Sequence, residues 1–371
     1  MPTQNTPSVK SVDPTGLTAI RLRKAAARFS VIALVLLSIT TAAAAVPAVP
    51  RGVFSLSPTG KKVSDTVLAN PNVVGVSIRQ DWASLEATEG KFDWSFLDSE
   101  VARIAGAGKK VILRINTQGG KPAWVTAAVQ AKNGKFYTFD NGGVTTTIPV
   151  FWNNTYLKKK KNMIAALGAH FTANPAIVIV TASFANAVTE DWNVPHEADE
   201  ILDWFAVGYT TARMLSAGKQ IIDATMAAFP NQLVTMAIGG NGHTGGTGNL
   251  DPTADYVAEN AIATARASWP GRMIAQINSL STFNPPAPGE VDSIWNLLWL
   301  SRPDVGAQMV YWCYDESTYR VNGGVPGDPT TVLKKCVDAA ASYQLKYVEI
   351  YQKDVVYLPS AIVYAKSKLA P

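Results

Sequence analysis

Short apolar runs alternate with longer segments of helical period along most of the chain. The runs are rich in Val and Ile and are bounded by Gly, Pro, Asn or Lys, which is typical of strands buried on both faces of a parallel sheet. Eight such runs are found, at residues 53–56, 73–78, 110–115, 176–184, 233–238, 272–277, 306–313 and 345–351. The pattern therefore predicts a parallel sheet of eight strands.

Helical periodicity fills the segments between these runs. In the first, Trp94, Leu97, Val101 and Ile104 fall on one helix face. Helices are predicted at 94–106, 156–171, 198–229, 256–268, 291–300 and 331–343. Alternating strands and helices indicate parallel βαβ units, and eight units favour closure into a single-domain (β/α)8 TIM barrel of the α/β class. An open doubly wound sheet is the alternative.

No strand is followed directly by a Gly-x-Gly-x-x-Gly turn and a helix, so a dinucleotide-binding fold is disfavoured. The Gly-rich stretch 239–248 follows the fifth predicted strand. We interpret it as a loop on the functional rim of the barrel.

The N-terminus has the order of a secretory signal. Basic residues between 21 and 28 precede an apolar run at 29–39, which is followed by small residues and by Pro47 and Pro50. We predict a signal peptide and leader at 1–48, cleaved near Ala45 or Ala48, and a barrel at 49–371. The mature protein is then secreted or periplasmic, with no stable membrane insertion; an uncleaved membrane anchor is the alternative.

Composition agrees with a globular chain, since 47% of the 371 residues are hydrophobic and 16% are charged. The formal net charge is +5, but four basic residues lie in the leader and four more form Lys158 to Lys161. The remaining charge is close to balanced, which disfavours a nucleic-acid partner. We interpret the lysine run as the solvated face of a helix.

One segment resembles a known family. Residues 73–98 contain a strand ending in a polar residue, then Trp82, Leu85-Glu86, a Glu-Gly-x-Phe-Asp-Trp motif and Leu97-Asp98. This order resembles the second strand and following helix of the barrel glycoside hydrolases, especially the β-galactosidase-like family 42 and its cellulase-like relatives. The third predicted strand with the Pro-Ala-Trp124 loop, and residues 150–157, extend the resemblance over roughly residues 50–195.

The resemblance implies an O-glycosyl hydrolase that acts on a poly- or oligosaccharide without a cofactor. Sugars present apolar ring faces that stack on aromatic rings, and hydroxyls that suit amides and guanidinium groups. In a barrel such groups are expected at the carboxyl ends of the strands. The candidate substrate-binding residues are Arg79, Trp82, Arg114, Asn116, Trp124, Asn186, Gln276, Asn278, Gln308 and Trp312.

Glycoside cleavage also needs two carboxyl groups flanking the bond. The resembled families place an acid/base Glu directly after an Asn at the end of the fourth strand. Here Glu190 comes four residues after Asn186, and we predict it as the acid, with Asp191 as the second choice. A carboxylate that only caps the next element is the alternative.

The second carboxyl group departs further from the family. The seventh predicted strand carries Gln308 where relatives carry a nucleophilic Glu, whereas Glu349 lies within the apolar eighth run. Since a buried carboxylate is costly unless it is paired or functional, we predict Glu349 as the second catalytic group. Its alternative is a structural partner of Arg79 or Arg114. The reserves are Asp315, Glu316 and Asp354.

Other chemistries have little support. The three histidines, His170, His196 and His243, lack metal-ligand spacing, so we expect no metal site, and no Gly-x-Ser-x-Gly elbow occurs. Cys313 and Cys336 form either a disulfide or two buried thiols. Two alternatives to a hydrolase stay open: a carbohydrate-binding barrel that has lost catalysis, and a secreted surface-assembly protein.

Overall fold

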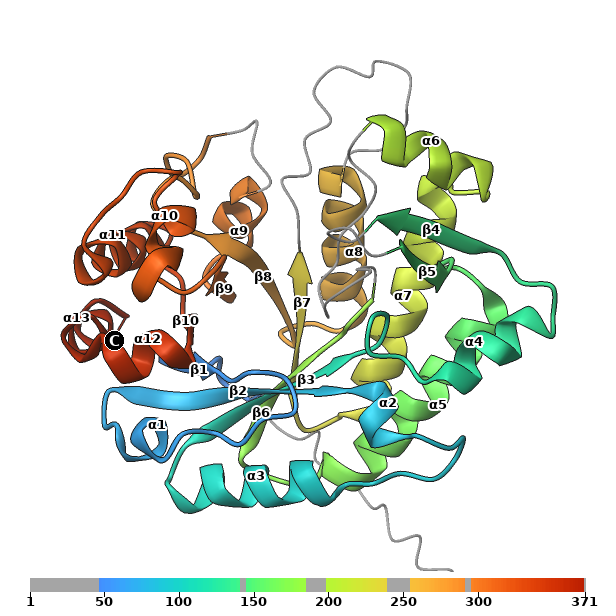
Figure 1. Cartoon of the computed structure of the whole chain (residues 1–371), viewed down its shortest axis with the longest axis horizontal. Helices are drawn as coiled ribbons and strands as arrows, with labels where there is room; N and C mark the ends of the chain where they lie inside the picture. Colours follow the sequence, from blue (N-terminus) through green and yellow to red (C-terminus); the bar gives the residue numbers. More distant parts are fainter. Residues whose placement is uncertain (1–46, 141–144, 185–197, 239–253, 291–294, 370–371) are drawn as a thin grey trace, which may run out of the picture. The chain divides into compact units, whose positions relative to one another are not determined.

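The computed structural model describes residues 47–140, 145–184, 198–238, 254–290 and 295–369. Eight parallel strands close into a barrel in the order β1-β10-β9-β8-β7-β6-β3-β2, with β2 returning to β1 (Figure 1). The strands are β1 (Gly52–Leu56), β2 (Val73–Asp81), β3 (Lys110–Asn116), β6 (Ile177–Thr181), β7 (Leu233–Ile238), β8 (Met273–Leu280), β9 (Val305–Met309) and β10 (Tyr347–Tyr351). All eight predicted strands and the TIM barrel are confirmed, and closure excludes an open sheet.

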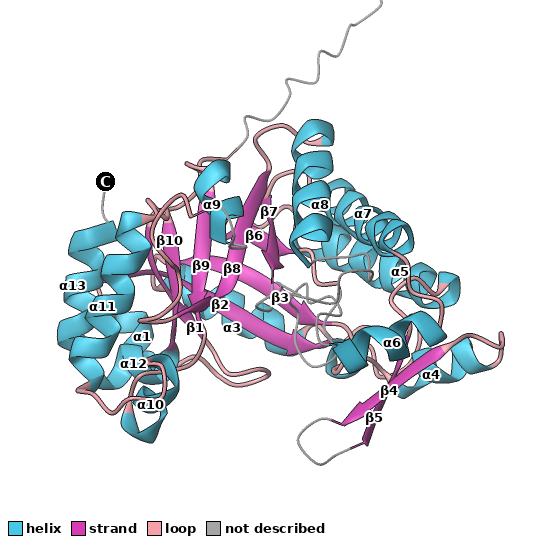
Figure 2. Ribbon diagram, turned by 90° about the horizontal axis from the view of Figure 1, so that it is seen from above, coloured by secondary structure: helices cyan, strands magenta, loops and turns pink. Residues whose placement is uncertain are grey.

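Helices surround the barrel, as Figure 2 shows from a second direction. They are α1 (Asp65–Ala69), α2 (Trp82–Leu85), α3 (Ser95–Gly106), α4 (Ala123–Gln130), α5 (Asn154–Phe171), α6 (Ala198–Ala206), α7 (Thr211–Ala228), α8 (Ala254–Ser268), α9 (Trp295–Ser301), α10 (Thr318–Val321), α11 (Pro329–Ser342), α12 (Gln352–Tyr357) and α13 (Pro359–Leu369), with a 3-10 turn η1 (Asp315–Ser317). No helix of the described residues combines the length and the apolar character needed to cross a membrane.

Two local differences from the predicted elements have clear causes. The helix predicted at 198–229 is two helices, because Gly208 adopts a φ of +96° and Thr210 caps α7 by accepting a hydrogen bond from the Arg213 N–H at 3.2 Å. An antiparallel hairpin of β4 (Phe136–Asp140) and β5 (Thr145–Pro149) was not predicted. Its strands are rich in aromatic residues and Thr and flank an Asn-Gly-Gly sequence, a hairpin signal that the barrel pattern obscured.

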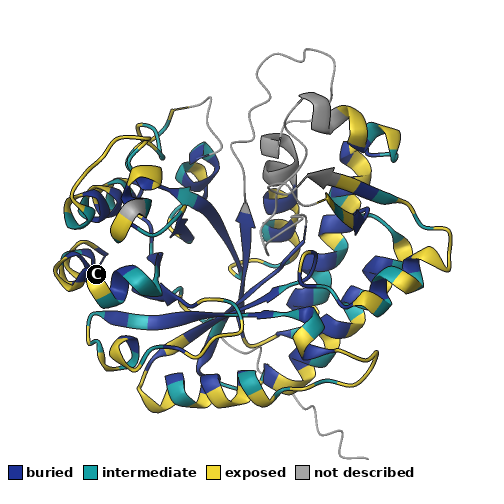
Figure 3. Ribbon diagram, viewed as in Figure 1, coloured by how far each residue is buried: buried dark blue, intermediate teal, exposed yellow. Residues whose placement is uncertain are grey.

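The lowest tier of the barrel interior is apolar. Side chains alternate between the inside and the outside of each strand, so one residue in two points inward. The inward cluster consists of Phe54, Ile112, Ile179, Leu233, Ile274 and Tyr347. Gly75 and Gly306 make room for its two rings: a Cβ atom at either glycine would lie 2.3 Å from the ring of Phe54 or Tyr347 respectively. The strands are buried, while exposed positions lie mainly on the outer helices (Figure 3).

Lys160 corrects the interpretation of the lysine run. Lys158 is exposed, but Lys160 follows Tyr156 by four residues and lies on the buried face of α5 with no exposed surface. Its Nζ lies 5.6 Å from the centroid of the Tyr156 ring and 5.5 Å from that of Phe184, and it has no hydrogen-bond partner among the described residues. Burial therefore lowers the pKa of Lys160 well below its usual value.

This burial predicts a pH-dependent stability. Because the pKa is lower in the folded state, the unfolded state binds more protons, and the free energy of unfolding rises with pH until it passes the unfolded pKa of about 10.4. We expect Lys160→Met to lose this rise and to be stabilised more near pH 7 than near pH 10. Urea denaturation at several pH values measures it. Lys158→Met is the matched control and should keep the parental profile; the same profile in Lys160→Met would contradict the argument.

Candidate functional site

A polar tier lies directly above the apolar floor of the barrel. Each strand points its next inward side chain two residues after the floor position. The polar side chains at these positions include Ser77, Arg114, Thr235, Gln276 and Glu349. All five have no exposed surface. Sequence alternation therefore places charge in the centre of the barrel, where each polar group needs a partner.

Arg114 and Glu349 are those partners for each other. The Arg114 Nη2 atom pairs with Glu349 Oε2, and Arg114 Nε donates to Glu349 Oε1 at 3.2 Å and to Ser77 Oγ at 2.9 Å. Gln276 Nε2 donates to Glu349 Oε2 at 2.6 Å. Both carboxylate oxygens of Glu349 thus accept hydrogen bonds. This pairing with Arg114 is the structural alternative that the sequence left open for Glu349.

Gln276 extends this network toward the mouth of the barrel. Its Nε2 donates to Asn278 Oδ1 at 2.7 Å, and its Oε1 accepts from the Tyr347 hydroxyl at 2.6 Å. Burial, with the Glu349 carboxylate nearby, raises the pKa of Tyr347, so its hydroxyl stays protonated as a donor. Asn278 is 9% exposed and Gln308 is 6% exposed, and the Gln308 Oε1 atom has no partner among the described residues. The network therefore reaches Asn278, which keeps a small exposed surface.

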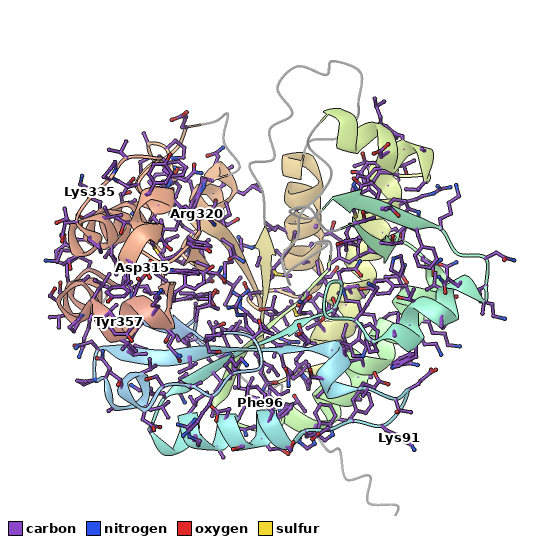
Figure 4. The ribbon with its side chains drawn as sticks, viewed as in Figure 1. Lys91, Phe96, Asp315, Arg320, Lys335 and Tyr357 are labelled. Atoms are coloured by element: carbon purple, nitrogen blue, oxygen red, sulfur yellow. The ribbon has the colours of Figure 1, made fainter. Side chains whose placement is uncertain are left out.

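An aromatic cleft of about 540 Å³ opens at the carboxyl ends of β1, β2, β9 and β10. It is lined by Leu56, Pro58, Ser64, Arg79, Trp312, Tyr351, Gln352, Lys353, Val356 and Tyr357. The Arg79 Nε atom donates to the Ser57 carbonyl at 2.8 Å, which holds the guanidinium at the β1 side of the cleft. Figure 4 labels Tyr357 on α12 and the neighbouring Asp315.

Trp312 is held firmly in the cleft wall. Its ring stacks on Tyr311 with centroids 3.9 Å apart and meets Tyr351 edge-on at 5.7 Å. Its indole N–H donates to Asp315 at 3.3 Å, and Asp315 also pairs with Lys353. The Lys353 ammonium, with further hydrogen bonds, holds the pKa of Asp315 below its usual value, so this reserve carboxylate is unsuited to donating a proton near neutral pH.

The reserve Asp354 anchors the loop that carries Trp312. Its fully buried carboxylate accepts hydrogen bonds from the Cys313 N–H at 2.9 and 2.8 Å and from the Tyr314 N–H at 2.7 Å. Burial raises the pKa of Asp354 to about 6. Cys313 and Cys336 are both buried free thiols, the second of the two alternatives left open.

Two of the predicted tryptophans do not reach the cleft. Trp82 has no exposed surface; its Nε1 donates to Glu86 Oε2 at 2.7 Å and its ring meets Trp124 edge-on at 5.8 Å. Trp124 is half-buried and donates to the Glu86 carbonyl at 2.9 Å. Neither ring lines the aromatic cleft, because Trp82 is fully buried and Trp124 packs against it. Asn116 is half-buried at the end of β3.

Sequence reasoning missed Asp81 and Tyr351. Asp81 is the last residue of β2, half-buried, and its carboxylate lies against the loop after β3: a Cβ at Gly120 would be 2.3 Å from Asp81 Oδ1. Tyr351 ends β10 in the cleft wall. Asp81 follows Arg79 by two residues, and Tyr351 follows Glu349 by two residues. Side chains two apart on a strand point to the same side, so this alternation was the sequence signal that would have found them.

Several predicted residues lie outside the described part of the chain. These are Asn186, Glu190, Asp191, His196, His243 and the Gly-rich stretch 239–248, and the side chain of Glu316 is likewise not described. Within the described residues, no group of three or more His, Cys, Asp or Glu side chains could hold a metal ion.

Part of the chain is similar to a family of known proteins. Residues 61–213 match the family model Glyco_hydro_42, described as beta-galactosidase, and this range contains the three resembling segments. The match spans less than half of the chain, so it shows a likeness to this family within residues 61–213. No curated protein matches its sequence.

Solved structures agree with the fold. The catalytic domain of β-amylase from Paenibacillus polymyxa superposes with a TM-score of 0.58 at 11% identity, over 87% of this chain and 100% of that one. The β-galactosidase from the psychrophilic Marinomonas ef1 has a TM-score of 0.49 at 13% identity, over 81% of this chain and 53% of that one. At such low identity the β-amylase likeness supports the barrel alone.

The Arg114–Glu349 pair can be separated experimentally from a catalytic role. Removing one charge leaves the other buried and unpaired, which typically costs about 3–5 kcal/mol, whereas replacing both by apolar residues is often neutral. We expect Glu349→Gln to lower the denaturation midpoint strongly and Arg114→Met/Glu349→Leu to recover most of it. Chemical denaturation of both single variants and the double variant measures this coupling. Additive losses in the double variant would contradict the pairing.

Proposed function

We propose that this protein is an exported glycoside hydrolase, which cleaves a poly- or oligosaccharide bound in the aromatic cleft. The observation that carries the proposal is the position of Trp312, Tyr351 and Arg79 together at the carboxyl ends of the strands. Aromatic rings suit the apolar faces of sugar rings, and a guanidinium suits their hydroxyls. A surface-assembly protein without a sugar site would not need this lining.

For the chemistry we propose Glu190 as the proton donor and Glu349 as the second carboxylate. Glu349 lies in the barrel centre, and its pairing with Arg114 suits a group that must act in the ionised form. The difficulty is access, because Glu349 has no exposed surface. Asp81, half-buried at the end of β2, is the rival second carboxylate that the structure adds.

The buried state of Glu349 also favours one specific alternative. If its only role is to neutralise Arg114, the cleft binds carbohydrate without cleaving it. Catalysis and binding therefore need separate measurements.

The test is a panel of secreted variants assayed on α- and β-linked polysaccharides. We expect Glu190→Gln to lose roughly 100-fold or more in kcat, the range for a general acid, while still binding the substrate. Trp312→Ala should instead raise KM, because it removes a stacking surface. Glu290→Gln, an exposed carboxylate outside the cleft lining, is the matched control and should behave as the parent.

The second carboxylate is identified by comparing Glu349→Gln with Asp81→Asn in protein shown to be folded at the assay temperature. The proposal for Glu349 holds if its variant is inactive and Asp81→Asn is active, and it fails if the opposite is found. If Glu190→Gln and Glu349→Gln process glycans as the parent does, the catalytic assignment is wrong. Recovery of the mature chain starting near residue 46 or 49 from the culture medium tests export.

A further inference from the structure

A second hollow lies away from the aromatic cleft, and it is strongly basic. It has a volume of about 450 Å³ and is formed by the segment between α4 and β4, the start of α5 and the start of α7. Three cationic side chains line it, Lys132, Lys135 and Arg213. Figures 1 and 2 both place α4, β4 and β5 on the side of the barrel opposite to α12 and β10, which border the cleft.

Two of these cations lie close to one point. The Cβ position at Gly208 lies 2.8 Å from Arg213 Nη1 and 3.7 Å from Lys135 Nζ. Arg213 Nη1 also donates to the Gly208 carbonyl, which fixes the guanidinium there. Two positive groups so close together repel each other unless an anion lies between them.

The described residues supply no such anion. No acidic residue lines the hollow, and no ion pair joins Lys132, Lys135 or Arg213 to a carboxylate within the described part of the chain. By contrast, Lys353 at the aromatic cleft is neutralised by Asp315. An external anionic group would therefore find positive charge in the basic hollow that no described carboxylate neutralises, and its electrostatic attraction is stronger there than at the aromatic cleft.

An aromatic ring stands beside these cations. Trp152 lines the basic hollow and also an adjoining one of about 490 Å³, and the two share Asn154 and Arg213. Trp204 and Tyr209 hold the Trp152 ring at interplanar angles of 54° and 67°. Trp152 is half-buried, and no described aromatic ring is stacked parallel on it.

We propose that this hollow binds an acidic sugar unit, with its carboxylate or sulfate between Lys135 and Arg213 and its ring against Trp152. The site is separate from the cleft in which cleavage is proposed, and it rests on the proposed function only in taking a sugar as the carrier of the anion. A polysaccharide with anionic units then contacts the barrel at two places. Such a contact raises the effective concentration of the chain at the cleft.

The test measures binding by titration calorimetry with four probes: tetragalacturonate, a sulfated chondroitin tetrasaccharide, neutral cellotetraose and inorganic sulfate. We expect at least one anionic tetrasaccharide to bind, with an affinity that falls as salt rises, and cellotetraose and sulfate to bind at least 10-fold more weakly. Whichever anionic tetrasaccharide binds more tightly decides between carboxylate and sulfate. Equal binding of cellotetraose, or of sulfate alone, would overturn the proposal.

Two charge-matched variants locate the site. Lys132→Gln/Lys135→Gln leaves the Arg213–Gly208 hydrogen bond intact and should weaken anionic binding at least 10-fold. Lys91→Gln/Lys335→Gln removes two exposed charges elsewhere, at positions labelled in Figure 4, and should bind as the parent does. Equal affinity in the two double variants would place the anion elsewhere and refute the site.

Trp312→Ala separates this proposal from the proposed function. It should keep the anionic binding of the basic hollow while it raises the KM for hydrolysis. Loss of anionic binding in Trp312→Ala would assign the ligand to the cleft and overturn the second site.

Discussion

The buried pair of Arg114 and Glu349 constrains the centre of the barrel. Neither charge has exposed surface, so each depends on the other and on neutral partners, Ser77 and Gln276, to offset the loss of water. These four residues come from β2, β3, β8 and β10, on different sides of the closed sheet. These four polar side chains above the apolar floor find their hydrogen-bond partners only when the four strands are in register. Closure of the barrel and the orientation of its polar side chains are therefore linked.

The same network prepares the mouth of the barrel. The Gln276 amide accepts a hydrogen bond through its oxygen and donates one to Asn278 through its nitrogen. It therefore orients Asn278, which is slightly exposed. The aromatic cleft is built separately, on a loop after β9 that the Asp354 carboxylate anchors through backbone N–H groups. A rigid polar centre and an anchored aromatic wall meet where a barrel enzyme places its substrate.

Divergence from the resembled family is concentrated at the carboxylates. The segment around β2 and α3 keeps the family pattern, and its Trp82 and Glu86 explain why: they bond to each other and support Trp124 beneath the rim. In this structure the contacts of these motif residues are packing contacts and internal hydrogen bonds. Gln308 occupies the seventh-strand position, and its register partner on β10 is Glu349.

Alternation and periodicity in the sequence were enough to predict the eight strands, the barrel and most of the helices, because a strand buried on both faces and an amphipathic helix each leave a local pattern. Residue chemistry at the strand ends also identified Arg79 and Trp312 for the cleft. The sequence could not separate Trp312 from Trp82, or exposed Lys158 from buried Lys160, because burial depends on neighbours distant in the chain. Only the closed barrel, through its strand register, decided that Glu349 meets Arg114 and not Arg79, and brought Lys135 beside Arg213.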